Sequence, residues 1–339
     1  MTRYLALREP SANHVYTQAA GPLALAELAL LCPEAADVAE VDLAGVSYVA
    51  LDADGVPPLL GHHSALLALF EDAGSPGEPL LRPVGVERPE VLPEDLVTIP
   101  KYPGKTNEQF TRLMVNLALA AVRRPAGRRR VLDPMCGRGT TLTTALRLGH
   151  DAVGVDRDPK VLDATAAFLK TWLRRGRLKH SADVTPVRRE GRRIGRRLDV
   201  TLTPPAGGEP LALAQLEGDG RRSAELCGRR GFDAVVLDAP YGVVHGAHRG
   251  RPGAQDAGVR ERSPGSLLAE GVPVWAGQLH RGGTLAIAWN TRTLSRDELL
   301  ATVRDAGLEP LDDGPWRDLS HRVDSSIQRD LLVAVRPTD

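Results

Sequence analysis

Residues 237–242 of the 339-residue chain read LDAPYG and combine side chains whose types could do chemistry together. They close an apolar stretch, Phe232–Leu237, that has the pattern of a buried β-strand. Asp238 would supply a hydrogen-bond acceptor at the strand end, Pro240 a stiff turn, and Tyr241 an aromatic face. Such a set suits a planar group that carries hydrogen-bond donors, and the alternative is an ordinary Asp-Pro turn.

A glycine-rich stretch, DPMCGRGTT at residues 133–141, follows another predicted strand. Gly137 and Gly139 lack side chains, so the backbone can approach a ligand closely, and the N–H groups that open the next helix at Thr140 face the same space. A further strand ends in Asp156, 19 residues after Gly137. This offset suits a carboxylate that accepts hydrogen bonds from a ribose diol, so the stretch predicts a nucleotide-like cofactor.

Two cofactors are compatible with this loop. A dinucleotide is usually bound by GxGxxG, whereas the residues from Gly137 are GRGTTL and lack the third glycine. The acid and proline that open the loop, Asp133 and Pro134, resemble motif I of S-adenosylmethionine-dependent methyltransferases, which favours the methyl donor. Asp183, which ends the next predicted strand in HSAD, is expected to meet the adenine edge of the donor; a helix cap or a solvated turn is the alternative.

Cys136 lies inside this loop, where a small side chain beside two glycines suits packing and no histidine is paired with it locally to make it a nucleophile. We assign Cys136 to the cofactor loop. His245 and His248 have the spacing of metal ligands, but no third ligand accompanies them, so we expect no metal. The three cysteines are far apart and form no CxxC pair, so neither a disulfide framework nor a zinc knuckle is expected.

The elements that must position these residues follow from hydrophobic periodicity. From residue 129 onward, predicted strands alternate with helices, which is typical of a parallel sheet. The Arg-, Gly- and Pro-rich interval 185–231 interrupts this rhythm and is expected to be an exposed insertion, partly a hairpin at Leu198–Leu202. Residues 1–95 predict a small α+β unit that includes a helix at Ser64–Glu71.

The Pro- and acid-rich stretch 74–96 has the composition of a linker. We therefore predict two domains, a small acidic one over residues 1–95 and an α/β domain over residues 96–339 with the insertion near 185–231. No stretch approaches the ~18 apolar residues of a membrane span, and the first residues lack a signal core. A cytoplasmic, soluble protein is the expectation.

The charge of the chain sums to zero but is unevenly distributed. Residues 1–99 hold 4 basic and 15 acidic side chains, which leaves 43 − 4 = 39 basic and 43 − 15 = 28 acidic ones in residues 100–339. The basic second half favours an anionic partner such as nucleic acid. Arginine outnumbers lysine 38 to 5, and solvated arginines that bind nothing are the alternative.

The LDAPYG stretch resembles the Asp/Asn-Pro-Pro-Tyr motif of methyltransferases that act on planar exocyclic amines, chiefly those of nucleobases. Acceptors fixed on both amine N–H groups favour a pyramidal nitrogen whose lone pair can point at the methyl group. Asp238 and the carbonyl of Ala239 or Pro240 would be these acceptors, and Tyr241 would stack on the base. Ala239 replaces a proline of the family pattern, which removes one φ restraint from the turn.

The segment Ile99–Ala121 resembles the region before motif I in THUMP-associated tRNA guanine-N2 methyltransferases and related RNA methylases. Thr106 and Asn107 open a helix there, and Asn116–Leu119 matches its Asn-x-Ala-Leu end. Thr106 would reach the methionine end of the donor or cap the helix. The resemblance implies a Rossmann-like class I methyltransferase with a mostly parallel seven-stranded sheet, preceded by a small α+β domain, S-adenosylmethionine as cofactor, and RNA, above all tRNA, as substrate.

The family match is weaker over residues 1–95, which are too short for a complete THUMP domain and whose acidity would repel RNA. RNA binding would fall to Arg123, Arg124 and Arg128–Arg130, to the stretch Arg188–Arg197, or to neither. A DNA adenine-N6 or cytosine-N4 methyltransferase uses the same motif and is the nearest alternative. A protein amide is a third acceptor, and an RNA-binding scaffold that binds the donor without turnover is the alternative of another class.

Overall fold

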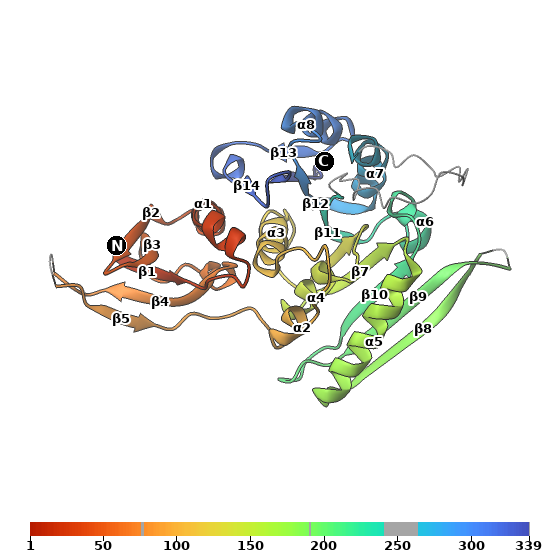
Figure 1. Ribbon diagram of the computed structural model, residues 1–339, viewed down its shortest axis with the longest axis horizontal. Helices are drawn as coiled ribbons and strands as arrows, with labels where there is room; N and C mark the ends of the chain where they lie inside the picture. The colour runs from red at the N-terminus through yellow and green to blue at the C-terminus, as the bar shows by residue number, and fades with distance from the viewer. Residues whose placement is uncertain (76–77, 190, 241–263, 339) are drawn as a thin grey trace, which may run out of the picture.

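The computed structural model describes residues 1–339 except 76–77, 190, 241–263 and 339. The chain forms two sheets that lie next to each other (Figure 1). The smaller one is antiparallel, in the order β2-β3-β1-β4-β5, and the helix α1 (His14–Leu31) packs between it and the larger sheet. Its strands are β1 (Thr2–Arg8), β2 (Ala36–Leu43), β3 (Val46–Ala53), β4 (Leu66–Asp72) and β5 (Leu81–Val84).

The larger sheet has ten strands in the order β13-β15-β12-β11-β6-β7-β10-β9-β8, with β14 paired to β15. Its central strands β12, β11, β6, β7 and β10 are parallel, and the strands that flank them are antiparallel. The bounds are β6 (Arg130–Asp133), β7 (Asp151–Asp156), β8 (His180–Arg189), β9 (Arg192–Leu202), β10 (Leu211–Glu217), β11 (Phe232–Asp238), β12 (Leu279–Asn290), β13 (Glu309–Leu311), β14 (His321–Arg322) and β15 (Gln328–Val335).

Helices cover both faces of this sheet, as expected for strands that are apolar on both sides. In β11, Val236 packs in the core on the side of α3 and α4, whereas Val235 and Leu237 pack in the core on the side of α7 and α8. The helices of the described residues are α2 (Asp95–Thr98), α3 (Glu108–Ala120), α4 (Thr140–Arg147), α5 (Pro159–Arg175), α6 (Ser223–Cys227), α7 (Pro264–Gln278) and α8 (Arg296–Asp305).

The two sheets share one core through α1 and α3. Glu27 of α1 is fully buried, and its carboxylate accepts hydrogen bonds from the Ser64 N–H and from Asn116 Nδ2 of α3, each at 3.0 Å. Tyr16 of α1 lies edge-on to His321 of β14, with ring centroids 5.7 Å apart. The apolar cluster also runs from the smaller sheet into α3 and α4. A domain division near residue 95 therefore stays a prediction.

The predicted fold class is confirmed, an α/β protein with a Rossmann-like sheet preceded by a smaller unit, but three details differ. The sheet has ten strands rather than seven and is mixed. The helix predicted at Ser64–Glu71 is wrong, because this Leu- and Ala-rich stretch forms β4, paired with β1; pairing in a sheet overrides helix propensity. The predicted linker contributes the edge strand β5 and the short α2.

The interval 185–231 is not simply an exposed insertion. It contains the end of β8 and all of β9 and β10, and β10 pairs in parallel with β7 in the interior of the larger sheet. Glycine- and arginine-rich composition concealed β9, because only alternate positions such as Leu198 and Val200 are buried. The long hairpin of β8 and β9 extends the larger sheet at one side, beyond its parallel strands (Figure 1).

Candidate functional site

Two acidic residues end neighbouring parallel strands at the same edge of the larger sheet. Asp133 is the last residue of β6, and Asp238 is the last residue of β11. From β6 the chain goes to β7 and β10 on one side and then returns to β11 on the other, so the strand order reverses between β6 and β11. Ligands of open α/β sheets bind at the carboxyl edge, at such a reversal point.

The loop between β6 and α4 presents bare backbone at this edge. Gly137 and Gly139 have φ angles of 49° and 82°, in the left-handed region that glycine adopts without strain. A Cβ atom added to Gly137 would have nothing within 4 Å. Gly139 precedes Thr140, the first residue of α4. A ligand can therefore approach the backbone at Gly137 directly, next to the start of a helix.

Three hydrogen bonds hold the loop against the neighbouring strands. The Cys136 N–H donates to the Val155 carbonyl at 3.0 Å, and the Gly137 N–H donates to Asp156 Oδ2 at 3.0 Å. Gln215 of β10 donates from Nε2 to the Gly137 carbonyl at 3.0 Å. The conformation of the loop is thus fixed by the ends of β7 and β10 before any ligand binds.

The donors and acceptors around the loop fit a cofactor with a nucleoside part. Asp156 is half-buried, and its Oδ1 accepts a second hydrogen bond, from the Asp158 N–H at 2.9 Å. A carboxylate has about four acceptor positions, so capacity remains for a diol. Gln215 is fully buried, and its Oε1 has no hydrogen-bond partner among the described residues. An orphaned acceptor of this kind is expected beside a polar ligand.

Asp133 differs from an ordinary surface acid because its side chain is buried, with 3% of the residue exposed. Burial raises the pKa of its carboxyl to about 7, and the charges of Asp156 and Asp238 act in the same direction. Hydrogen bonds from the Met135 N–H, at 3.0 Å, and from Thr141 oppose the rise of this pKa. Near neutral pH, Asp133 is thus an acid whose charge varies.

Asp238 is held by a hydroxyl group and a cation. Thr106 Oγ1 donates to Asp238 Oδ2 at 2.7 Å, and the Arg329 guanidinium lies 3.3 Å from the same oxygen. Arg329 is 5% exposed and stands over the Phe110 ring, 4.9 Å from its centroid. The side chain of Asp238 therefore has a defined orientation, and as a carboxylate it only accepts hydrogen bonds.

Sequence reasoning did not find Arg329. The residue lies in β15, which pairs antiparallel with β12. The signal that could have found it is the arginine itself, next to a run of buried apolar residues from Leu331 to Val335. A cation in a buried strand requires an acidic partner, and the ends of the other strands are where the acids stand.

The structure excludes one of the two roles expected for Thr106. Asn107, not Thr106, is the N-cap residue of α3, and its side chain accepts a hydrogen bond from the Phe110 N–H at 3.0 Å. The Thr106 hydroxyl is directed to Asp238 instead. The capping role is therefore wrong for Thr106, and contact with the donor stays a prediction.

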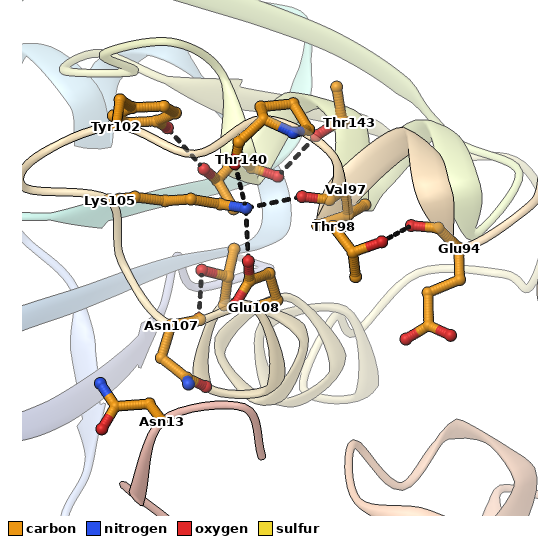
Figure 2. Close-up of polar contacts among 12 residues, drawn as sticks. Asn13, Glu94, Val97, Thr98, Tyr102, Lys105, Asn107, Glu108, Thr140 and Thr143 are labelled. Carbon is orange, nitrogen blue, oxygen red and sulfur yellow. Dashed lines mark hydrogen bonds and ion pairs between the residues drawn. The ribbon is translucent and has the colours of Figure 1, made fainter. Parts of the chain in front are cut away.

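The segment before Thr106 is anchored to α4 (Figure 2). The Tyr102 hydroxyl and Thr140 Oγ1 are hydrogen-bonded at 2.8 Å, and Lys105 Nζ donates to the Val97 carbonyl at 2.7 Å (Figure 2). Lys105 also forms an ion pair with Glu108 in the first turn of α3. These contacts fix the turn from which Thr106 reaches Asp238.

The turn after Asp238 is tied to the sheet at the position where the family pattern changes. The Ala239 N–H donates to the Ala288 carbonyl at 2.8 Å, a bond that a proline could not make. Ala239 is buried and Pro240 is exposed. The φ restraint that Ala239 lacks is thus offset by a hydrogen bond. Tyr241 lies outside the described residues.

The position expected for Asp183 is wrong. Asp183 lies inside β8, exposed and opposite Asp199 of β9, and does not end a parallel strand. The strand next to β7 is β10, which ends in Glu217 and is followed closely by Asp219. A hydrogen bond from Arg221 lowers the pKa of Asp219. The β8–β9 hairpin precedes β10 in the chain, and this displaced the sequence assignment.

Cys136 agrees with the packing interpretation. It is buried beside Gly154, where a Cβ atom would come within 2.6 Å of its sulfur, and burial raises its pKa well above the ordinary value, which disfavours a thiolate. His245 and His248 lie outside the described residues. Within the described part of the chain, no group of three His, Cys, Asp or Glu residues could hold a metal ion, and no helix is long and apolar enough to cross a membrane.

Comparison with known proteins finds no matching family model and no matching curated protein. Among solved structures, TrmN from Thermus thermophilus has 14% identity over 99% of this chain and 100% of that chain, with a TM-score of 0.46. The 16S rRNA N2 methyltransferase RsmC from Thermus thermophilus, in complex with AdoMet and guanosine, has 17% identity over 91% of this chain and 60% of that chain, with a TM-score of 0.37.

A TehB-like SAM-dependent methyltransferase from Corynebacterium glutamicum has 18% identity over 63% of this chain and 83% of that chain, with a TM-score of 0.34. With TM-scores of 0.46 or lower, these three likenesses carry no argument about reaction or substrate. The functional reasoning therefore depends on the residues of this chain.

Proposed function

We propose that the chain is an S-adenosylmethionine-dependent methyltransferase that modifies the exocyclic amine of a base in RNA, with tRNA as substrate and guanine N2 as target. The observation that carries the proposal is the meeting of the glycine loop 134–139 with Asp238 at the reversal of strand order. The choice of tRNA and of guanine N2 is supported by the resemblance of the segment Ile99–Ala121.

The donor site would be formed by the carboxyl ends of β6, β7 and β10. Asp156 would accept hydrogen bonds from ribose hydroxyls, the bare backbone at Gly137 would lie against the donor, and Asp219, which follows the end of β10, would take the place near adenine first expected for Asp183. The bound donor supplies a methyl group on a sulfonium. The other residues proposed for this site are Thr106, Asp133, Pro134, Cys136, Gly139 and Thr140.

The acceptor amine would lie against Asp238. Its carboxylate would accept one N–H, and the carbonyl of Ala239 or Pro240 the other, so that the nitrogen lone pair is directed at the methyl group. Thr106 and Arg329 hold the carboxylate in place during this step. The amine loses its proton only after the methyl group has moved, so Asp238 acts by hydrogen bonding and no strong base is required. Tyr241 is proposed to stack the base on its sequence position alone.

The test is the variant Asp238→Ala, with Asp183→Ala as matched control because Asp183 is an exposed acid away from this edge. We expect Asp238→Ala to lower methyl transfer to tRNA by about 10²–10³-fold, since a fixed partner of the transition state is lost. Binding of the donor, measured by calorimetry, should remain. Asp183→Ala should retain full transfer.

Mass spectrometry of tRNA nucleosides from cells with and without the gene identifies the product. A missing N2-methylguanosine supports the proposal. Undiminished transfer by Asp238→Ala contradicts the mechanism, and unchanged tRNA together with altered DNA methylation contradicts the substrate.

A further inference from the structure

Two groups of arginines stand at opposite edges of the larger sheet. Arg123, Arg124 and Arg128–Arg130 lie around the start of β6, at the amino edge of the parallel strands. The hairpin of β8 and β9 carries the other group near its tip, where Arg188 is paired in register with Arg193. The register of β9 with β10 places the tip of the hairpin at the carboxyl edge of the sheet, where the candidate site lies.

The register fixes how far the hairpin projects. β9 runs antiparallel to β10, and their last pair is Arg197 with Leu216. A Cβ atom at Gly195 would come within 2.6 Å of the carbonyl of Glu217, the last residue of β10, and Glu217 is in register with Asp156. The chain beyond Gly195 therefore passes the end of β10. Arg192 lies three residues further, about 10 Å past the sheet edge at ~3.4 Å per residue.

Four of the five arginines at the amino edge form ion pairs, and Arg129 shares Asp233 with Arg124. Arg123 pairs with Glu309 at 2.7 Å, and Arg124 pairs with Asp233 at 3.1 Å. Arg128 pairs with Asp151. Their charges serve the fold and lie on the wrong side of the sheet for a substrate that must reach Asp238.

The arginines at the hairpin tip differ in their ion pairing and in the edge of the sheet at which they lie. Arg192 and Arg193 are exposed, and neither forms an ion pair with a carboxylate of the described residues. The hairpin is anchored at the point where it leaves the sheet, because Arg196 donates hydrogen bonds to Asp163 at 2.7 Å and to Glu217 at 3.0 Å. Among the described residues, Arg192 and Arg193 are thus cations without a paired carboxylate on an anchored support, at the edge where the candidate site lies.

We propose that the tip of the β8–β9 hairpin, through Arg188, Arg192 and Arg193, binds the phosphate backbone of the RNA substrate while the base lies at Asp238. This inference rests on the proposed function. Four strand spacings separate β9 from β11, about 19 Å at ~4.8 Å each. At ~3.4 Å per nucleotide of a stacked strand, the contacted phosphates lie about six nucleotides from the modified base.

The test compares the pair Arg192→Gln and Arg193→Gln with the pair Arg174→Gln and Arg175→Gln. Both pairs remove two charges from exposed positions, but Arg174 and Arg175 lie in the last turn of α5, at the amino edge. Binding of an in vitro transcribed tRNA is measured without donor over a range of salt concentrations. We expect the hairpin pair to weaken binding about tenfold and to reduce the salt slope by about 1.4, that is ~0.7 per contact, with the α5 pair changing binding less than twofold.

The same variants are then compared in methyl transfer, where the hairpin pair should raise KM for tRNA and leave kcat at saturating tRNA unchanged. Equal effects of the two pairs, or no effect of the hairpin pair on binding, overturn the inference. Tighter binding of duplex DNA than of tRNA overturns RNA as the occupant. Hairpin-dependent tRNA binding without methyl transfer by the wild type contradicts the proposed function and leaves the inference standing.

Discussion

Asp133 and Asp238 are the same residue type at the ends of adjacent parallel strands, and each is followed by a turn that contains proline, yet their surroundings differ. Asp133 is buried with hydrogen-bond donors but forms no ion pair with the cations of the described residues, and burial raises its pKa to about 7. Asp238 keeps some exposure, at 14% of its side chain, and is in contact with the Arg329 guanidinium. One acid has a charge that varies near neutral pH, and the other is an oriented carboxylate.

The difference indicates how a single edge can serve two tasks. Asp133 accepts a hydrogen bond from the Met135 N–H and so shapes the loop proposed to hold the donor. Asp238 is fixed by Thr106 and Arg329, which come from elements distant in sequence, and so presents a defined acceptor to the proposed amine. Preorganisation of this kind requires that the support be rigid before the substrate arrives.

The largest effect that would break this comparison is expected from Arg329→Met, which removes the guanidinium 3.3 Å from Asp238 Oδ2. We expect kcat for methyl transfer to fall about 10²-fold and the free energy of unfolding to fall by about 3 kcal/mol, because a half-buried carboxylate loses a charged partner. Enzyme kinetics and chemical denaturation measure the two losses. Arg329→Lys, which keeps the charge, should recover part of kcat. A variant with lower stability but normal kcat would contradict the positioning role.

A smaller effect is expected from Thr106→Val, which removes the 2.7 Å hydrogen bond to Asp238 Oδ2 and keeps the shape of the side chain. The loss of about 1–2 kcal/mol of orientation corresponds to a decrease in kcat of about 5–30-fold. Thr106→Ser keeps the hydroxyl group and should behave nearly as the wild type. If Thr106→Val changed only the affinity for the donor, Thr106 would belong to the donor site and not to Asp238.

The smallest expected effect is a change in how the stability of the protein depends on pH when Asp133 is replaced. The folded-state pKa of Asp133 lies above its ordinary value, so its contribution to stability is fully present at low pH and is lost as pH rises through about 7. Asp133→Asn removes this loss and keeps an acceptor for the Met135 N–H. The melting temperature of the variant relative to the wild type should therefore be higher at pH 8 than at pH 5. A difference that does not change with pH would show that burial does not control this acid.

The sequence predicted the parts of the fold and site that depend on local pattern. Strand ends in β6, β7 and β11 carry Asp133, Asp156 and Asp238 directly after apolar runs, and such patterns are visible without a structure. β4 was misread because Leu and Ala favour helices in isolation, and its strand state depends on β1 and β5.

The parts that failed depend on long-range pairing. Asp183 appeared to end a central strand because nothing local distinguishes an edge hairpin from a parallel strand, and the order of β8, β9 and β10 is set by tertiary contacts. Arg329 was missed for the same reason, since its importance arises only when β15 is placed beside β12 and its side chain reaches Asp238 at the end of β11.

The buried carboxylate of Glu27 has a further consequence for how this chain can change over evolution. Its hydrogen-bond donors come from both parts of the molecule, Ser64 near the smaller sheet and Asn116 on α3. Loss of either donor leaves a buried negative charge with fewer partners, which is costly wherever the charge cannot reach water. Substitutions at these three positions are therefore coupled, and we expect that the acidic N-terminal part cannot be exchanged freely for an unrelated module.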